Sequence, residues 1–120
     1  MIDEKAKILI AEDETIIAID IKTTLQKIGY AVAEIATSGE KVIEYLSKEK
    51  PDLILMDIEL AKMDGIEATR IIKNKFFYKD IPIIALTAYA SKGDKERILA
   101  SGMDDYISKP IEIPDFIKKL

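Results

Sequence analysis

Polar residues of a few reactive types follow four of the apolar runs in this 120-residue chain. A pair of carboxylates follows the run KILIA, an aspartate follows LILM, a threonine follows PIIAL, and a lysine follows DYIS. In chain order these residues are Glu12 and Asp13, Asp57, Thr87, and Lys109. Carboxylates, a hydroxyl and an amine can hold a hard metal ion, attack an electrophile or bind a phosphate group.

The chain contains no histidine and no cysteine, which narrows the chemistry of these residues. Ser-His-Asp catalysis, histidine- or thiolate-ligated metals and cysteine nucleophiles are excluded. A metal would have to be held by oxygen, and mutually repelling carboxylates with few protein ligands favour Mg²⁺. An aspartate can attack phosphorus, because phosphoryl transfer depends on charge neutralisation and positioning more than on proton transfer. The Lys109 ammonium and the Thr87 hydroxyl would then bind phosphoryl oxygens.

Each of these residues also has a plainer explanation when it is taken singly. Asp13 could be the N-cap of the helix that follows it, and Thr87 could bond its own backbone. The pair Asp64-Gly65 is typical of a turn, and Asp104 is expected only to end a loop. The case for a shared site therefore depends on the polar residues occurring together, each at the end of a different strand.

Apolar runs alternate with amphipathic stretches five times, which predicts five strand–helix units. The predicted strands span residues 7–11, 30–36, 53–56, 82–86 and 105–108. Helices are predicted over residues 14–28, from the capping residue Ser38 to before Pro51, and over residues 66–73, 92–101 and 114–120. Continuous Ile and Leu runs, rather than alternating ones, are typical of a parallel sheet covered on both faces. Because ligands of such α/β sheets bind at the carboxyl ends of the strands, the polar residues should converge on one edge.

Composition and charge exclude several other functions. The 18 basic and 22 acidic residues give a net charge of −4 without a basic patch, so direct binding of nucleic acid is not expected. No apolar run approaches the roughly 20 residues needed to cross a bilayer. The charged start MIDEKAK is not a secretory signal, so we expect a cytoplasmic protein without membrane insertion. The length suits a single domain over residues 1–120.

Five motifs give the sequence a family resemblance: ILIAED (8–13), DLILMD (52–57), MDG (63–65), ALTA (85–88) and YISKP (106–110). In these motifs the chain resembles the receiver domain of two-component response regulators over essentially its whole length. The resemblance implies a doubly wound, five-stranded parallel (βα)5 sheet of the flavodoxin-like type, with strand order 2-1-3-4-5. It also implies a phosphoacceptor signalling switch in a two-component system or phosphorelay. The phosphoryl donor would be the phosphohistidine of a sensor histidine kinase or a histidine phosphotransfer protein.

The resemblance assigns roles in acceptance of the phosphoryl group and in metal binding. Asp57 matches the phosphoacceptor of the family, which becomes an aspartyl phosphate. Asp13 matches a direct ligand of Mg²⁺, for which Mn²⁺ could substitute, and Glu12 matches a ligand that acts through water. Glu59 stands where the family uses a backbone carbonyl for the metal, so its side chain is not the expected ligand.

The resemblance also implies a phosphate pocket and a switch. Thr87, Ala88 and Lys109 match the phosphate-binding positions, and a cis Pro110 is expected after the lysine. On phosphorylation, Thr87 would move toward the phosphate and Tyr106 would turn into the space vacated beside Ala88. The surface of the fourth helix, fifth strand and fifth helix would then change shape for a downstream effector domain or protein.

Such a domain is not a dedicated enzyme, although it would catalyse its own Mg²⁺-dependent phosphorylation and dephosphorylation on Asp57. Two alternatives stay open. A haloacid-dehalogenase-like phosphatase uses the same residue types, but its Asp-x-Asp-x-Thr pattern is replaced here by the sequence EDET (12–15). A pseudo-receiver would act as a docking module without phosphorylation. The predicted last helix, residues 114–120, is only about two turns long, which favours a chain cut from a longer regulator or hybrid kinase over a stand-alone receiver.

Overall fold

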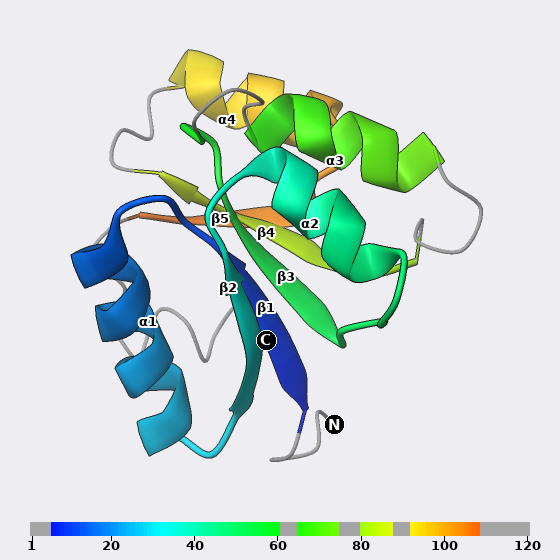
Figure 1. Cartoon of the computed structure of the whole chain (residues 1–120). Coiled ribbons are helices and arrows are strands. Elements are labelled where there is room, and N and C mark those ends of the chain that lie inside the picture. The colour runs from blue at the N-terminus through cyan, green and yellow to red at the C-terminus, as the bar shows by residue number, and fades with distance from the viewer. Residues whose placement is uncertain (1–5, 61–64, 75–79, 88–91, 109–120) are drawn as a thin grey trace.

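A computed structural model describes residues 6–60, 65–74, 80–87 and 92–108 of the chain. These residues form five parallel strands, hydrogen-bonded in the order β2-β1-β3-β4-β5 (Figure 1). The strands are β1 (Lys7–Ala11), β2 (Ala31–Ala36), β3 (Leu53–Asp57), β4 (Ile83–Thr87) and β5 (Asp105–Ser108). The helices are α1 (Thr15–Lys27), α2 (Gly39–Leu46), α3 (Gly65–Asn74) and α4 (Lys92–Ala100). The predicted α/β class and strand order are confirmed.

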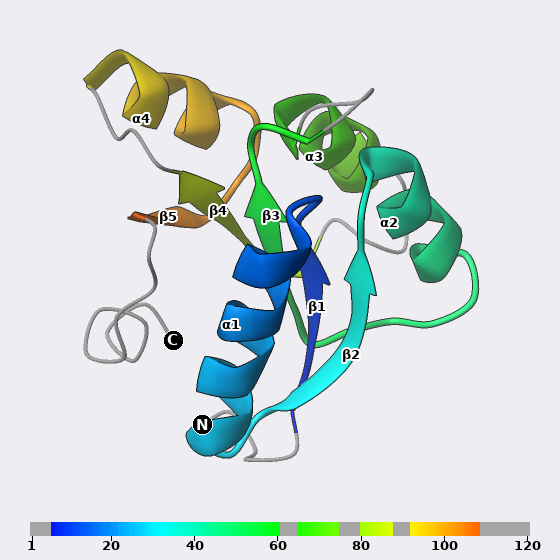
Figure 2. The ribbon, with the colours of Figure 1, turned by 60° about the vertical axis from the view of Figure 1, so that its left-hand side comes forward.

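Helices lie on both faces of this sheet. Helix α1 packs on one face, and α2, α3 and α4 lie on the other (Figures 1 and 2). The central strands β1, β3 and β4 are buried almost throughout, as their continuous Ile and Leu runs predict. The outer strands β2 and β5 are only partly buried. The carboxyl ends of these three neighbouring strands are therefore firmly held.

Two expectations from the sequence concern the extent of the chain. The predicted helix 114–120 lies outside the described residues, and the single-domain span 1–120 reaches beyond them, so both stay predictions. Within the described ranges, no helix is both long enough and apolar enough to cross a membrane.

The ends of two helices test the predicted caps. The Ser38 side chain accepts a hydrogen bond from the Lys41 backbone N–H at 3.2 Å, so Ser38 caps α2 as predicted. The N-cap of α1 is Glu14, and its side chain makes no capping hydrogen bond. Asp13 lies one residue before the cap, so the explanation of Asp13 as the N-cap is wrong. Its carboxylate is available for another role.

Two strands are one residue longer at their carboxyl ends than the sequence predicts. Asp57 and Thr87 were expected just after a strand, but they are the last residues of β3 and β4. Asp57 aligns with Leu86 across the β3–β4 pair, and Thr87 aligns with Ser108 across the β4–β5 pair. Because strand residues are fixed by their hydrogen-bonded neighbours, the sheet rather than a loop positions both side chains.

Helix α3 begins against the backbone of β3. The Gly65 backbone N–H donates to the Ile58 carbonyl at 3.2 Å. A Cβ atom on Gly65 would overlap the Asp57 carbonyl oxygen and would lie 2.9 Å from the Met56 Cγ. A glycine is required for such a close approach of two segments of backbone. The interpretation of Asp64-Gly65 as turn chemistry therefore missed a contact that sets how closely α3 approaches Asp57.

The opposite edge of the sheet, at the amino ends of β4 and β5, is held by hydrogen bonds around Asp104. The Asp104 backbone N–H donates to the Ile83 carbonyl, and Asp104 Oδ2 accepts from the Ile83 N–H, both at 2.8 Å. From the last turn of α3, Lys73 Nζ donates to the Ile81 carbonyl at 2.8 Å and lies 3.3 Å from Asp104 Oδ2. The Lys73 side chain is only 17% exposed. Asp104 thus joins α3, β4 and the start of β5 instead of merely ending a loop.

Replacing Asp104 by alanine should lower the free energy of unfolding by about 2 kcal/mol, because a mostly buried ammonium and a backbone N–H lose a charged acceptor. The matched control is Asp80→Ala, since Asp80 pairs with Lys50 at 3.5 Å and both side chains are more than half exposed. An exposed pair of this kind contributes at most about 1 kcal/mol. Urea unfolding followed by circular dichroism measures both changes. Equal losses in the two variants would contradict the structural role of Asp104.

Gly65→Ala should destabilise the protein by roughly 1–3 kcal/mol, although alanine is the better helix former, because the added methyl group overlaps the Asp57 carbonyl. The control is Gly93→Ala at an exposed position of α4, where the same change should be neutral or stabilising. The urea midpoints of the two variants give the comparison. If Gly65→Ala were as stable as the wild type, the close approach of α3 to β3 would not be required.

Candidate functional site

Three carboxylates from two neighbouring strand ends meet at the carboxyl edge of the sheet. Strands β1 and β3 pair in parallel with Ala11 opposite Met56, so the next residues, Glu12 and Asp57, end adjacent strands. One carboxylate oxygen from each of Glu12, Asp13 and Asp57 lies within 4.8 Å of the other two. The structure thus brings together three of the residues that the sequence assigns to one site.

Burial concentrates the negative charge of this carboxylate cluster. Glu12 is fully buried and Asp57 is 3% exposed, whereas Asp13 is half-buried, so the cluster reaches the surface at Asp13. Carboxylates at this separation repel one another strongly where little water screens them. A cation among them would offset the repulsion, and a donor set made only of oxygen suits Mg²⁺ or Mn²⁺. The described residues therefore fit the metal that the sequence predicts.

Backbone hydrogen bonds hold the strand ends that carry the cluster. Asp57 Oδ1 accepts a hydrogen bond from the Glu59 N–H at 2.9 Å. The Ile58 N–H donates to a carbonyl of β4 at 3.2 Å, and the Glu12 N–H donates to the Ala36 carbonyl of β2 at 3.0 Å. The backbone at Glu12 and Asp57 cannot separate to relieve the repulsion between their carboxylates without loss of these bonds.

Glu59 takes part in this arrangement through its backbone. Its side chain is exposed and is not one of the three clustered carboxylates. Its N–H binds Asp57 Oδ1, as described above. The sequence assigns a different atom of Glu59, the backbone carbonyl, to the metal, and that role stays a prediction.

Thr87 and Tyr106 lie on the face of the sheet that α4 covers. Thr87 is 2% exposed at the end of β4, and Tyr106 in β5 aligns with Ala85 of β4. Thr87 and Ala85 are two residues apart on β4 and therefore share a face of the sheet. Tyr106 lies beside Ala85 on β5, so the three residues form one row that starts at the carboxyl edge. The Tyr106 side chain is half-buried against the apolar cluster beneath α2, α3 and α4. This row joins the carboxylate edge to the region of α4.

Three predicted site residues, Ala88, Lys109 and Pro110, lie outside the described residues. Because β4 ends at Thr87 and β5 ends at Ser108, Ala88 and Lys109 are the next residues along the chain from two neighbouring strand ends. The phosphate-binding roles of Ala88 and Lys109, and the cis bond before Pro110, stay predictions.

Sequence reasoning missed two residues that adjoin the site. The first is Gly65, for which the available signal was a glycine at the start of a helix, where glycine is unfavourable unless space requires it. The second is Lys95, whose ammonium nitrogen lies 5.2 Å from the centroid of the Tyr106 ring. Its signal was its spacing from Ile98, because residues three apart on a helix share a face.

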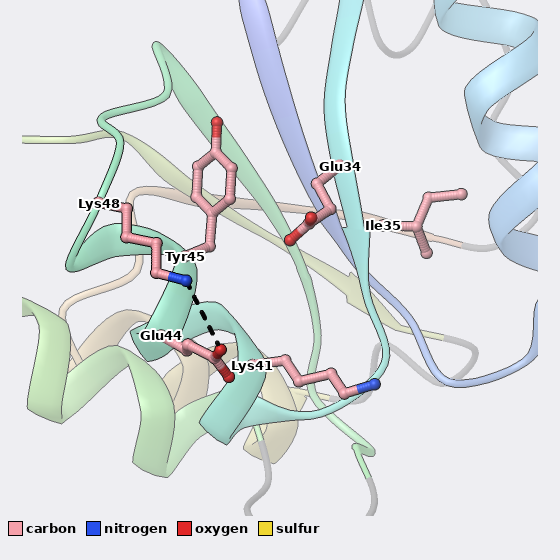
Figure 3. Close-up of a pocket in the computed structure, with 6 residues that line it drawn as sticks. All are labelled: Glu34, Ile35, Lys41, Glu44, Tyr45 and Lys48. Atoms are coloured by element: carbon pink, nitrogen blue, oxygen red, sulfur yellow. Dashed lines mark ion pairs between the residues drawn. The ribbon is translucent and has the colours of Figure 1, made fainter.

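A cavity of about 320 Å³ lies between β2 and α2 (Figure 3). It is lined by Glu34, Ile35, Lys41, Glu44, Tyr45 and Lys48. Figure 3 shows the ion pair between Glu44, in the last turn of α2, and Lys48, just beyond the end of this helix. Their charged atoms lie 4.0 Å apart. Burial and the carboxylates of Glu49 and Glu34 raise the pKa of the Tyr45 hydroxyl above its usual value. No sequence-predicted site residue lines this cavity, so it is separate from the carboxylate cluster.

The sequence is similar to known proteins over nearly its whole length. The profile of the response regulator receiver domain family matches residues 8–120. The polar-differentiation response regulator DivK of Brucella ovis is 38% identical over 113 residues, which cover 94% of this chain and 91% of DivK. The profile match spans all of the described strands except Lys7, the first residue of β1, so the likeness concerns the whole sheet and not one motif.

Solved structures share the same flavodoxin-like architecture. The receiver domain of a sensor histidine kinase from Pseudomonas aeruginosa PAO1, which has a magnesium ion coordinated in its active-site cleft, is 35% identical. It superposes with a TM-score of 0.87 over 96% of this chain and 93% of that one. The chemotaxis protein CheY4 of Vibrio cholerae is 30% identical, with a TM-score of 0.88 over 96% and 95% of the two chains. From the profile match, the fold and these likenesses together, the chain belongs to the response regulator receiver domain family of two-component signalling.

Proposed function

We propose that this chain is a phosphoacceptor switch of a two-component system or phosphorelay. Asp57 takes a phosphoryl group from the phosphohistidine of a sensor histidine kinase or a histidine phosphotransfer protein. In this step a P–O bond to the Asp57 carboxylate forms and the P–N bond breaks. The imidazole keeps the electron pair of the broken bond and is reprotonated on the partner.

The observation that carries this proposal is the carboxylate cluster at the end of β1 and β3. Its three oxygens lie within 4.8 Å of one another, and Asp57 is held by the ladder of β3. A nucleophile toward phosphorus needs a fixed position and a neutralised charge. The first requirement is supported by the strand position of Asp57, and the second by two further carboxylates that can bind a cation beside it.

The same cluster supports a role for Mg²⁺, with Mn²⁺ as a substitute. Asp13 and Asp57 would be direct ligands, Glu12 a ligand through water, and Glu59 a ligand through its backbone carbonyl. When it is bound, the metal neutralises charge between the acceptor and the phosphoryl oxygens. Asp13 is the half-buried member of the cluster, which suits a ligand that faces an ion entering from solvent.

The transmission of the signal is proposed to run through Thr87 and Tyr106. Phosphorylation adds about −1.5 to −2 units of charge at the carboxyl edge. The Thr87 hydroxyl, together with Lys109 and the backbone N–H of Ala88, binds the phosphoryl oxygens. Movement of Thr87 toward the phosphate makes room for Tyr106 to turn inward along the row that it shares with Ala85. The face of α4, β5 and the fifth helix then changes for a downstream effector domain or protein.

Family membership affects the two alternatives from the sequence, a phosphatase and a pseudo-receiver, in different ways. Membership of the receiver family removes the support for a haloacid-dehalogenase-like phosphatase, whose motif the chain also lacks. A pseudo-receiver that docks without being phosphorylated stays an alternative, and the labelling experiment below distinguishes it. A cytoplasmic location is the setting that the proposal requires, because the phosphodonors act there, and it stays a prediction.

Incubation with Mg²⁺ and acetyl phosphate should add the mass of one phosphoryl group to the wild-type protein, as measured by intact-mass spectrometry. Asp57→Asn or a chelator should abolish the addition, because the nucleophile or the neutralising charge is then missing. The matched control is Asp20→Asn, at an exposed position of α1, which should be labelled like the wild type. Equal labelling of Asp57→Asn would assign the acceptor to another residue. A wild-type protein that is never labelled would favour the pseudo-receiver.

Mg²⁺ should raise the melting temperature of the wild type, because an ion bound only by the folded state stabilises it. In the absence of Mg²⁺, Asp13→Asn should be more stable than the wild type by about 1 kcal/mol, since one of three mutually repelling charges is removed. The same variant should lose most of its response to Mg²⁺. Differential scanning fluorimetry with and without the ion tests both effects, with Asp20→Asn as the control. An undiminished Mg²⁺ response in Asp13→Asn would contradict its assignment as a ligand.

A further inference from the structure

Few of the described side chains of α4 face the sheet. Among its described residues, Ile98 is the one that is fully buried, and Glu96, Arg97, Leu99 and Ala100 are exposed. Lys95 is an exception to the exposed pattern, because it is half-buried although it carries a charge. It lies three residues before Ile98 and therefore on the same, sheet-facing side of α4.

The feature that accounts for this placement is the ring of Tyr106. Lys95 Nζ lies 5.2 Å from the ring centroid, within the distance at which an ammonium is attracted by the negative face of an aromatic ring. Among the described residues, Lys95 makes no ion pair within 4.0 Å, so the ring is the electrostatic partner that the structure gives it. The aliphatic stem of a lysine can lie along an apolar surface while its ammonium reaches such a partner.

The sheet alone does not enclose Tyr106. It lies on the outer strand β5, its side chain is half-buried, and its neighbour in β4 is the small residue Ala85. Ala85 gives the ring no large side chain of β4 to pack against. The contact with Lys95 favours the orientation that the structure has.

We propose that Lys95 is a positioning residue for Tyr106, whose ammonium holds the ring in its half-buried orientation and so sets how readily the ring turns when the carboxyl edge is modified. This inference rests on the proposed function and deepens it, because it assigns to α4 a residue that regulates the relay from Thr87. Turning of the ring ends its contact with the ammonium. The same movement therefore changes both the shape and the charge that α4 presents to an effector.

The size of the effect follows from the strength of a partly exposed cation–π contact. Its loss should change the ratio of the two ring orientations roughly two- to five-fold in favour of the turned one. The coupling is reciprocal: the turned orientation favours phosphorylation of Asp57 by the same factor by which phosphorylation favours the turned orientation. Removal of the charge should therefore move the unphosphorylated protein part of the way toward its phosphorylated state.

The experiment is ¹⁹F nuclear magnetic resonance on protein that contains 3-fluorotyrosine at its five tyrosines. The Tyr106 signal is identified as the one missing from Tyr106→Phe. In unphosphorylated protein, Lys95→Gln should shift this signal and leave the other four in place, whereas Lys95→Arg should restore the wild-type position because it keeps the cation. Lys22→Gln, an exposed position on α1, is the matched control and should leave the signal unchanged.

The same samples are then measured after treatment with Mg²⁺ and acetyl phosphate. We expect the shift caused by Lys95→Gln to lie along the line that joins the unphosphorylated and phosphorylated wild-type signals. The inference is overturned if the Tyr106 signal of Lys95→Gln does not move, if Lys95→Arg behaves like Lys95→Gln, or if the shift points away from that line while the wild type is phosphorylated normally. A wild type that takes no phosphoryl group overturns the proposed function instead, and the unphosphorylated spectra still decide the role of Lys95.

Discussion

Like charges that are held close together and away from water are the constraint on which the carboxyl edge of this sheet depends. Glu12 and Asp57 are buried, and Asp13 lies with them inside a span of 4.8 Å. On flexible loops these groups would separate. Here the β1–β3 pairing and the hydrogen bonds at the strand ends keep Glu12 and Asp57 together, so this edge favours a cation that neutralises its charge.

The remainder of the fold holds the carboxylate cluster rigidly and connects it to α4. Three central strands are covered on both faces, which makes the positions of Asp57 and Thr87 properties of the sheet. The row through Thr87, Ala85 and Tyr106 leads from the edge to α4, where Ile98 is buried and Lys95 contacts the Tyr106 ring. The central strands therefore hold Asp57 and Thr87 in fixed positions, as the chemistry requires, whereas few of the described side chains of α4 hold it to the sheet.

The sequence predicted the parts of this structure that follow from local patterns. Continuous Ile and Leu runs identified the strands, Ser38 identified a helix start, and the polar residue after each run identified the edge where Asp57 lies. Contacts between distant segments could not be predicted in this way. The approach of Gly65 to the Asp57 carbonyl depends on where α3 begins in space, and the bonds of Asp104 depend on the arrangement of α3 and β4.

In the functional site, too, local patterns predicted some features and missed others. The residue types at the strand ends were sufficient to suggest a metal and a phosphoryl acceptor, because their chemistry does not depend on exact distances. The N-cap explanation of Asp13 failed because the first turn of α1 begins one residue later, a difference that spacing cannot resolve. The sequence indicated little about Lys95, because the role of a lysine on the sheet-facing side of a polar helix cannot be inferred before the position of the Tyr106 ring is known.

The bonds around Asp104 have a mechanical consequence for the other edge of the sheet. Ile83, the first residue of β4, exchanges two hydrogen bonds with Asp104, and Lys73 ties the chain just before it to α3. Strand β4 is therefore clamped at its amino end, while Thr87 stands at its far end. Because β4 is also paired with β3 and β5 along its length, we expect a change at the carboxyl edge to involve the Thr87 side chain and to leave the strand itself, and the bonds around Asp104, in place.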